Sequence, residues 1–208
     1  MDPGGDAGPV EPVRCLLLDD PDPDVVELTS RPGVISVDVV DHERIHLLAE
    51  RSMPAVAPTW SALVWTALWT AAGPAHDDVA TTLHVDRHPV WGDHLDDPGD
   101  ALLMVSLVAS LPGMEAADFA GRYRAHAEVA RTHHGFDAYR QNVVTSRSGH
   151  LADGTAAVSE ILLATEDAWR NSFYATPSSA EIVGNDVTRF LDRTGTSSTL
   201  VRRFPGTA

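Results

Sequence analysis

Residues 119–142, with the sequence FAGRYRAHAEVARTHHGFDAYRQN, decide the expected fold, because an amphipathic helix here gives way to a strand at a glycine. At helical spacing, one stripe carries the side chains that we expect to be buried: Phe119, Tyr123, His126, Ala127, Ala130 and His134. Gly135 is expected to end the helix in the left-handed conformation. Residues 136–145 then alternate as a strand does, with Tyr139 and Gln141 on one face.

Two polar side chains on this stripe are the first candidates for chemistry. Tyr123 and His126 lie one turn apart, where leucine would stabilise a purely structural helix more. Histidine titrates near neutral pH and is the most frequent general acid or base. We therefore interpret His126 as a proton-transfer residue. A hydrogen bond from His126 to Tyr123 or to a backbone carbonyl is the structural alternative, and it stays equally open at this point.

A longer pattern extends from this stretch towards the end of the chain. Its members are Phe119, Tyr123, His126, Ala127, Gly135, Tyr139, Gln141, Asn142, Asp153-Gly154, Glu160 and the tail NDVTRFLDRT. With this pattern, the second half of the chain resembles the EthD family of ferredoxin-like proteins. The resemblance implies a dimeric α+β barrel, and relatives of that fold include cofactor-free monooxygenases and aromatic polyketide cyclases. This chain has Glu128 and Leu163 where the family usually has a proline and an aromatic residue.

The order of apolar runs predicts a degenerate copy of the same unit in the first half. Residues 61–72, SALVWTALWTAA, form the most apolar run and correspond in order to residues 156–165, which favours a strand over a helix there. Two further pairs correspond in the same way: a short helix over 77–82 with one over 166–174, and a last strand over 83–91 with one over 199–204.

The expected fold class is therefore α+β, with two ferredoxin-like units that form one α+β barrel as a pseudo-dimer within the chain. We expect a flexible tail over residues 1–12, a degenerate unit over 13–98 and an EthD-like domain over 99–208. An acidic turn at residues 96–100 marks the boundary. In single-unit relatives a second subunit covers the free face of the sheet. Here the first half would do so, which leaves homodimer formation open.

Composition limits the partners and the compartment. The chain has 208 residues, of which 43% are hydrophobic, enough to build real cores. Fifteen basic and thirty acidic residues give a net charge of −15, which repels phosphate backbones and anionic lipid, so we expect neither a nucleic-acid nor a membrane partner. The single cysteine, Cys15, lies in an apolar run, and the N-terminus has no signal-peptide pattern. These features predict a cytoplasmic protein.

Other polar residues extend the candidate site around His126. Tyr139 is assigned with Tyr123 and His126 to the catalytic set, because a phenol can orient a substrate oxygen. Asn142 is expected to bind substrate by holding an enolate or carbonyl oxygen. Glu160, also assigned to substrate binding, would either raise the basicity of a histidine or pair with an arginine on a neighbouring strand.

Tryptophans are expected chiefly in the core, but four of the five lie in the first half, which suggests that this half lines a flat, aromatic pocket. The residues assigned to that wall are Trp65, Trp69 and Trp169.

No metal, haem or nucleotide cofactor is expected. The densest histidine cluster is His84, His88 and His94, and its first spacing of four suits a helix. The surrounding sequence LHVDRHPVW reads as a strand and contains Pro89, which argues against a helix there. The sequence also has no glycine-rich phosphate loop.

Together these residues favour a cofactor-independent enzyme whose partner is a hydrophobic, oxygen-bearing small molecule, such as a polyketide-like or aromatic intermediate. Acid/base chemistry by His126 would drive cyclisation, dehydration or isomerisation, which are cyclase, lyase or isomerase activities. A cofactor-free monooxygenase of the same barrel superfamily is one alternative, because it also begins with proton removal. A non-catalytic module that binds a ligand or assembles with a partner enzyme is the other.

Overall fold

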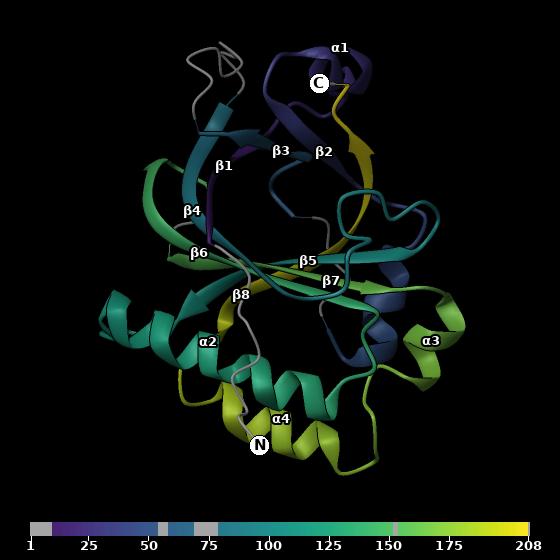
Figure 1. Cartoon of the computed structure of the whole chain (residues 1–208), viewed down its shortest axis with the longest axis vertical. Coiled ribbons are helices and arrows are strands. Elements are labelled where there is room, and N and C mark those ends of the chain that lie inside the picture. Colours follow the sequence, from purple (N-terminus) through teal and green to yellow (C-terminus); the bar gives the residue numbers. More distant parts are fainter. Residues whose placement is uncertain (1–9, 54–57, 69–78, 152–153, 208) are drawn as a thin grey trace.

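The chain folds around a closed barrel of antiparallel strands. The computed structural model describes residues 10–53, 58–68, 79–151 and 154–207 (Figure 1). Its strands are β1 (Glu11–Leu18), β2 (Val34–Val40), β3 (Ala62–Ala67), β4 (Val79–Trp91), β5 (Leu102–Ser110), β6 (Ala138–Gly149), β7 (Thr155–Leu163) and β8 (Leu191–Pro205). Their order around the barrel is β1-β3-β2-β8-β5-β7-β6-β4, and every neighbouring pair is antiparallel.

This barrel corrects the expected fold class. The structure is one closed, eight-stranded antiparallel barrel with few helices, and the prediction of two ferredoxin-like units forming an α+β barrel is wrong. Main-chain hydrogen bonds join the two halves along β2 with β8 and along β4 with β6. The order of elements along the chain does not specify which strand edges pair, and closure removes every free edge. One core cluster inside the barrel accordingly draws on both halves, including Val13, Leu63, Val105 and Val158.

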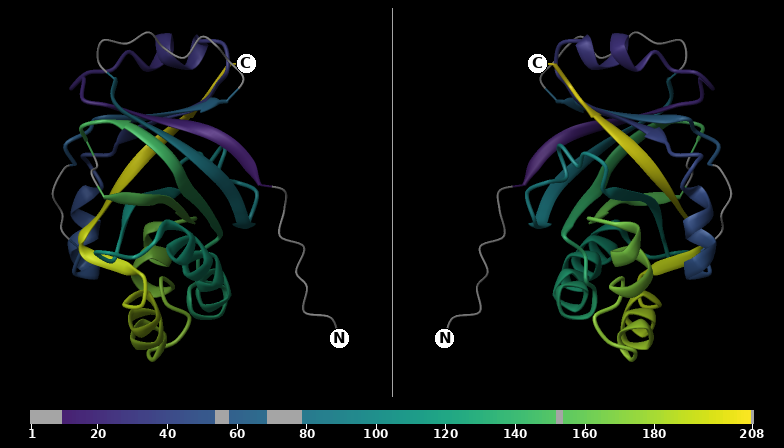
Figure 2. Two further views of the ribbon diagram at one scale, coloured as in Figure 1. Left: turned by 90° about the vertical axis from the view of Figure 1, so that its left-hand side faces the viewer. Right: turned by 90° about the vertical axis from the view of Figure 1, so that its right-hand side faces the viewer.

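Three helices of the second half lie outside the barrel on one side. They are α2 (Ala116–His133), α3 (Glu166–Asn171) and α4 (Ser179–Val187), and Figures 1 and 2 show α2 and α4 side by side against the outer face of the sheet. In the described part of the first half, the helices are α1 (Val25–Ser30) and the 3-10 helix η1 (Ile45–Arg51). At the opposite end of the molecule, the Thr207 N–H donates to the Thr29 carbonyl and fixes the end of the chain beside α1 (Figure 2).

Several expected elements can be compared with the observed ones. The strand expected over residues 61–72 is confirmed by β3, although residues 69–72 lie outside the described part of the chain. The short helix expected over 77–82 is wrong for residues 79–82, which begin β4, while residues 77–78 are not described. Of the flexible tail expected over residues 1–12, residues 1–9 lie outside the described part of the chain, and Glu11 is already the first residue of β1. The division at residues 98–99 stays a prediction.

The end of α2 differs from the expected left-handed glycine. His134 caps the helix in an extended conformation, with φ −113° and ψ 154°, and its N–H donates to the Ala130 carbonyl. Gly135 is needed for space instead, because a Cβ there would lie 2.1 Å from the Ser172 carbonyl oxygen. This close approach lets the segment after α3 pass directly over the junction between α2 and β6.

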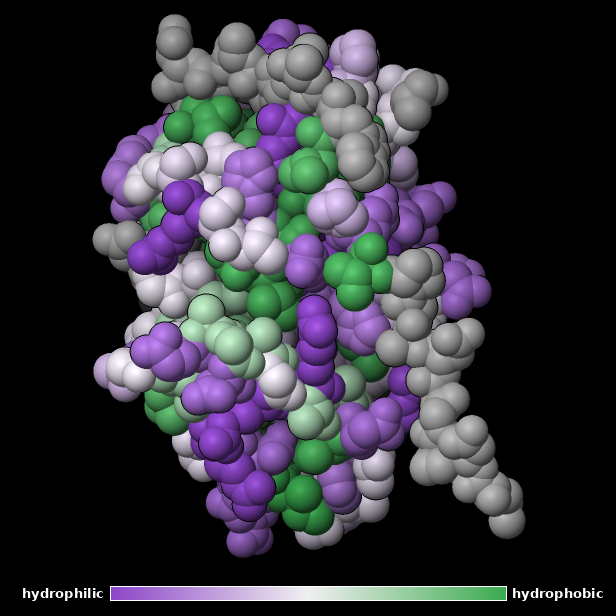
Figure 3. Space-filling model, turned by 60° about the vertical axis from the view of Figure 1, so that its left-hand side comes forward, coloured by the Kyte–Doolittle hydropathy of each residue, from purple (hydrophilic) through white to green (hydrophobic). Residues whose placement is uncertain are grey.

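The surface mixes hydrophilic and hydrophobic residues on the face drawn in Figure 3, without separation into a polar and an apolar side. The large hydrophobic side chains exposed in the described part of the chain are far apart in the sequence: Val10, Val26, Leu68, Ile182 and Phe204. None of the helices that the structure describes is long and apolar enough to cross a membrane.

Candidate functional site

A cavity of about 190 Å³ lies between the outer face of the barrel and the helices α2 and α4. All three residues assigned to the catalytic set, Tyr123, His126 and Tyr139, line it. A protein cavity of about 150 Å³ is enough to hold benzene, so this space suits a ligand of about one aromatic ring. The structure thus brings the predicted catalytic residues together at one small cavity.

His126 forms a hydrogen-bonded pair with Asp186 of α4. The His126 Nδ1 lies 2.8 Å from the Asp186 Oδ2, and the side chains are 9% and 23% exposed. When Nδ1–H donates to the carboxylate, the lone pair is on Nε2, which has no hydrogen-bond partner in the described part of the chain. A carboxylate that holds an imidazole in this way orients it as a proton acceptor. The partner is therefore Asp186, and neither Tyr123 nor a backbone carbonyl as the structural alternative supposed.

Tyr123 presents a buried hydroxyl with unused hydrogen-bonding capacity. Its ring packs against Phe119 and Phe190, with ring centroids 5.4 and 5.9 Å away. The hydroxyl makes no well-directed hydrogen bond to any described residue, although the Tyr139 and Ser159 hydroxyls lie within hydrogen-bonding range of it. Burial raises the pKa of Tyr123 well above its ordinary value. The phenol is therefore a neutral donor at physiological pH.

Tyr139 is positioned by a side-chain amide. The Gln141 Nε2 donates both to the Tyr139 hydroxyl at 3.0 Å and to the Tyr123 main-chain carbonyl at 2.7 Å. This amide ties the start of β6 to the middle of α2. Burial raises the pKa of Tyr139, so its phenol also keeps its proton near neutral pH. Two protonated phenols thus meet at one part of the cavity wall.

His134 also lines the cavity, and sequence reasoning missed it as a site residue although it lies on the buried stripe. Its ring stacks on Phe136 and Tyr174, with centroids 4.1 and 5.0 Å away. Its Nδ1 lies 2.9 Å from the Phe173 carbonyl oxygen, to which it donates as N–H. Burial lowers the pKa of His134 to about 4, and the bond to Phe173 opposes that shift only in part. The imidazole is neutral at pH 7, with Nε2 as an acceptor.

Four further polar residues were missed. Asp186 lies in the tail quoted for the family resemblance, but nothing in the sequence pairs it with His126. Ser106, Ser159 and Ser198 line the same cavity, and the Ser106 and Ser198 hydroxyl oxygens are 2.8 Å apart. A usable signal was present, because single serines interrupt the apolar strands LLMVSLVAS and TAAVSEILL at outward-facing positions.

Asn142 and Glu160, both expected to bind substrate, lie on the other side of the sheet, inside the barrel. The Asn142 Nδ2 donates to the Glu160 Oε1 at 2.8 Å, and the Glu160 Oε2 lies 2.7 Å from Arg203 and 3.5 Å from Arg140. Burial by itself would raise the pKa of Glu160, but Arg203 and Arg140 outweigh it and lower the pKa to about 2. Of the two roles considered for Glu160, the structure shows the arginine pairing.

Of the three tryptophans expected to form an aromatic wall, the two that the structure describes also lie away from the cavity. Trp65 is inside the barrel, where its Nε1 donates to the Asp38 Oδ2 at 2.8 Å and the Arg87 guanidinium lies 4.9 Å from the centre of its ring. Trp169 is fully buried in the core outside the barrel, and its Nε1 donates to the Leu47 carbonyl at 3.1 Å. Trp69 lies outside the described residues. The aromatic lining of the cavity comes instead from Phe136, Phe173, Tyr174 and Phe190.

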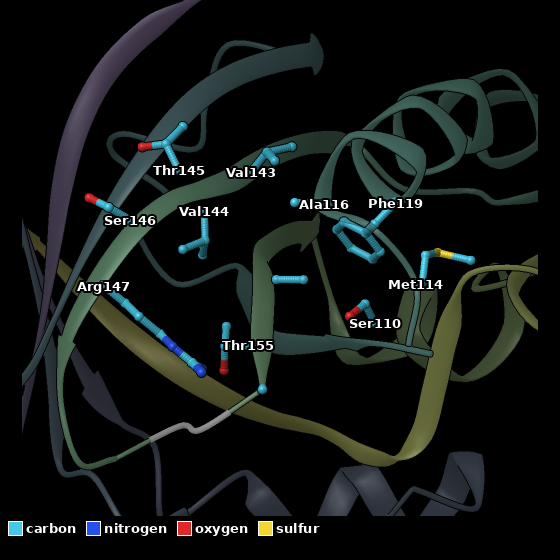
Figure 4. A pocket seen from close by; sticks show the side chains of 12 residues that line it. Ser110, Met114, Ala116, Phe119, Val143, Val144, Thr145, Ser146, Arg147 and Thr155 are labelled. Atoms are coloured by element: carbon cyan, nitrogen blue, oxygen red, sulfur yellow. The ribbon is translucent and has the colours of Figure 1, made fainter. Parts of the chain in front are cut away.

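A second cavity, of about 320 Å³, lies near the start of α2 (Figure 4). Met114, Phe119 and Val143 form its apolar part, and Arg147 and Thr155 approach each other at one side. None of the residues assigned from the sequence lines it among those described. It has no carboxylate or imidazole in its described lining, so it offers no acid/base group of the kind found beside α2.

Metal-ligating side chains do not gather in the described part of the chain, where no group of three or more histidine, cysteine, aspartate or glutamate residues is arranged to hold an ion. The expectation of a metal-free, cofactor-free protein stays a prediction.

Comparison with known proteins supports the fold at low sequence identity. One solved structure that is similar to this chain is described as a "Crystal structure study of anthrone oxidase-like protein". The match covers 96% of this chain and 94% of the chain in that structure, with a TM-score of 0.54 and 12% sequence identity. The two proteins have the same barrel fold. No family model matches the sequence, so the EthD resemblance has no support at that level, and no curated protein matches either.

Proposed function

We propose that this protein is a cofactor-independent enzyme that transfers a proton to or from a small hydrophobic molecule bearing oxygen, bound in the cavity beside α2. One observation carries the proposal. The imidazole of His126, oriented by Asp186 at 2.8 Å, borders the same cavity as the neutral phenols Tyr123 and Tyr139. A base and hydrogen-bond donors that converge on one space are what proton removal beside a carbonyl group requires.

The division of labour follows from the hydrogen bond between His126 and Asp186 and from the neutral phenols. The Nε2 of His126 accepts the proton as the C–H bond breaks, and the Asp186 carboxylate stabilises the imidazolium that forms. The electron pair moves to the substrate oxygen, where Tyr123 and Tyr139 donate hydrogen bonds to the developing enolate. In an isomerisation the same proton returns to a different atom. In a dehydration the proton leaves with the departing hydroxyl group as water.

The lining favours an aromatic or conjugated substrate. Phe136, Phe173 and Tyr174 contribute faces and edges of rings, and His134 is a neutral aromatic ring under physiological conditions. Flat rings pack well against such walls. The cavity volume of about 190 Å³ limits a fully enclosed ligand to about one ring, so a larger substrate would extend past its edge.

Oxygenation is the second candidate, favoured by the neighbour of the same fold whose name is anthrone oxidase-like. The first step would be the same proton removal. The carbanion would then react with O2, and conversion of the CH2 group to C=O would release one molecule of water. The final assignment between isomerase-type and oxygenase chemistry therefore depends on whether O2 is consumed.

Deuterium exchange tests the proposal without knowledge of the natural substrate. Anthrone and a panel of hydroxynaphthalenes are incubated in D2O under argon, and deuterium uptake at carbon is followed by NMR. We expect the wild-type protein to accelerate uptake for at least one compound, and His126→Gln to lower that rate about a hundredfold or more. His133→Gln, which removes an imidazole of the same helix that does not line the cavity, should leave the rate unchanged.

Three results would separate the candidates. Exchange that depends on His126, with O2 consumption when air is admitted, would select the oxygenase. Exchange without O2 consumption would select the isomerase, lyase or cyclase class. Binding of the panel without any exchange would contradict the enzyme proposal and support a ligand-binding module. The expected cytoplasmic location and the absence of nucleic-acid and membrane partners stay predictions.

A further inference from the structure

A row of polar side chains crosses the outer face of the sheet beneath α2. Gln141 of β6 is the register partner of Ser159 of β7, Ser159 is the partner of Ser106 of β5, and Ser106 is the partner of Ser198 of β8. We call these four residues, Gln141, Ser159, Ser106 and Ser198, the polar rung. Its three serines line the cavity that contains His126.

The rows on either side of the polar rung are apolar or aromatic. On one side, the paired residues are Tyr139, Ile161, Met104 and Leu200. On the other side, Val143 pairs with Ala157 and Ala157 with Val108. A sheet face covered by helices is stabilised by apolar side chains, so four consecutive polar residues in one row need an explanation other than packing.

Hydrogen bonds within the protein leave part of the polar rung unused. The Ser106 and Ser198 hydroxyls, 2.8 Å apart, share one hydrogen bond, which leaves the proton of the acceptor serine available. Ser159 lies beside the hydroxyls of Tyr123 and Tyr139. The Tyr123 hydroxyl and the Gln141 side-chain oxygen are buried without a hydrogen-bond partner among the described residues.

We infer that the polar rung holds two oxygens of one planar ligand, and that the preferred ligand carries them on alternate carbons of an aromatic ring, as in resorcinol. One oxygen is held by Ser159 with the two phenols, and the other by the Ser106–Ser198 pair. Neighbouring strands lie about 4.8 Å apart, so the backbone positions of the register partners Ser159 and Ser106 are separated by about that distance. Two oxygens on alternate carbons of a six-membered ring are separated by almost the same distance, whereas oxygens on adjacent carbons are closer and those on opposite carbons are farther apart. This inference rests on the proposed function for its choice of cavity and adds the substitution pattern of the ligand.

Isomers of benzenediol provide a matched test, because resorcinol, catechol and hydroquinone have the same composition and differ only in the separation of the oxygens. Dissociation constants are measured by NMR titration in anaerobic buffer, with phenol as the one-oxygen reference. We expect resorcinol to bind about fivefold more tightly than the other three, as one additional hydrogen bond gives. Ser106→Ala and Ser159→Ala should each abolish that preference. Ser148→Ala, on the exposed part of β6 outside the cavity, should keep it.

Equal affinities for the three isomers, or a resorcinol preference that survives in the Ser106→Ala and Ser159→Ala proteins, would overturn the inference. Its failure is distinguishable from failure of the proposed function. Equal affinities together with deuterium exchange that depends on His126 would remove the polar rung from ligand selection and leave the enzyme proposal intact. A resorcinol preference without exchange on any panel compound would support the polar rung as a ligand-selecting feature and contradict the enzyme proposal. Absence of binding by all four compounds would contradict the inference.

Discussion

The barrel interior and the cavity beside α2 both bury polar groups, but they use their hydrogen bonds differently. Inside the barrel the groups are charged and satisfy one another, since Arg203 donates twice to Asp38 at 2.6 Å and also contacts Glu160 at 2.7 Å. In the cavity the groups are neutral or partly exposed, and the Tyr123 hydroxyl has no partner among the described residues. Paired groups hold the barrel together, whereas unpaired ones are available to a ligand.

The comparison teaches that burial of a polar residue does not by itself identify a site. Glu160 is more deeply buried than His126, with 0% against 7% exposure, and its pKa is lowered to about 2, yet the neighbouring arginines account for that shift. The interior also has exceptions. The Arg87 Nη2 and the Arg140 Nε lack hydrogen-bond partners in the described part of the chain. Arg87 is compensated in part by its position over the Trp65 ring.

The largest expected effect comes from breaking the interior network. Glu160→Ala removes the carboxylate that faces Arg203 and Arg140, and leaves their charges buried without it. We expect the free energy of unfolding to fall by about 3–5 kcal/mol, the usual cost of breaking a buried ion pair. Urea unfolding followed by circular dichroism measures this loss. Glu128→Ala, on the exposed face of α2, is the control and should change stability by no more than about 0.5 kcal/mol.

A smaller effect is expected from pH, through His134. Its pKa is about 4 in the folded protein and about 6.5 in the unfolded chain, so between those values the unfolded chain binds a proton that the folded protein does not. Stability therefore rises with pH across this window and falls as pH decreases through it. From pH 7 to pH 5 this one group costs about 2 kcal/mol of stability.

Other groups also titrate between pH 5 and pH 7, so the loss of stability in the wild-type protein is compared with the loss in a variant that lacks the His134 imidazole. Unfolding curves of the wild-type protein and of His134→Phe, which keeps a ring between Phe136 and Tyr174, are recorded at pH 7 and pH 5. The wild-type protein should lose about 2 kcal/mol more than the variant. Parallel losses in both proteins would show that His134 is not held neutral by the fold.

The smallest expected change in stability is at Tyr123. Because its hydroxyl is buried and makes no well-directed hydrogen bond to a described residue, Tyr123→Phe should leave the unfolding free energy within about 0.5 kcal/mol or raise it slightly. Resorcinol binding, in contrast, should weaken about fivefold, because a donor to the ligand is lost. Calorimetric unfolding and NMR titration of the same preparation check both values. A clear loss of stability with unchanged binding would place Tyr123 with the structural residues of the barrel interior.

Local features were predictable from the sequence, and the pairing of distant segments was not. Alternation along residues 136–145 predicted that Tyr139 and Gln141 face one way. The structure confirms it, because Gln141 donates both to the Tyr139 hydroxyl and to the Tyr123 carbonyl of α2, while Asn142 donates to Glu160 inside the barrel. That same alternation argued against placing Asn142 with His126. The link from His126 to Asp186 spans 60 residues and depends on how α4 packs on α2, which no local spacing encodes. Closure of the barrel depends in the same way on strand edges far apart in the chain.

The claim that the cavity, and not the barrel interior, carries the chemistry is tested most directly by one paired measurement. Initial deuterium-exchange rates per folded molecule are recorded for His126→Gln and Glu160→Gln, with the folded fraction taken from the unfolding curve of each preparation. We expect the first variant to lose about a hundredfold or more in rate while its stability changes by about 1 kcal/mol, as for the loss of one hydrogen bond. The second should lose stability and keep its rate. Near-normal exchange in His126→Gln, together with loss of exchange in folded Glu160→Gln, would contradict the account and move the site into the barrel.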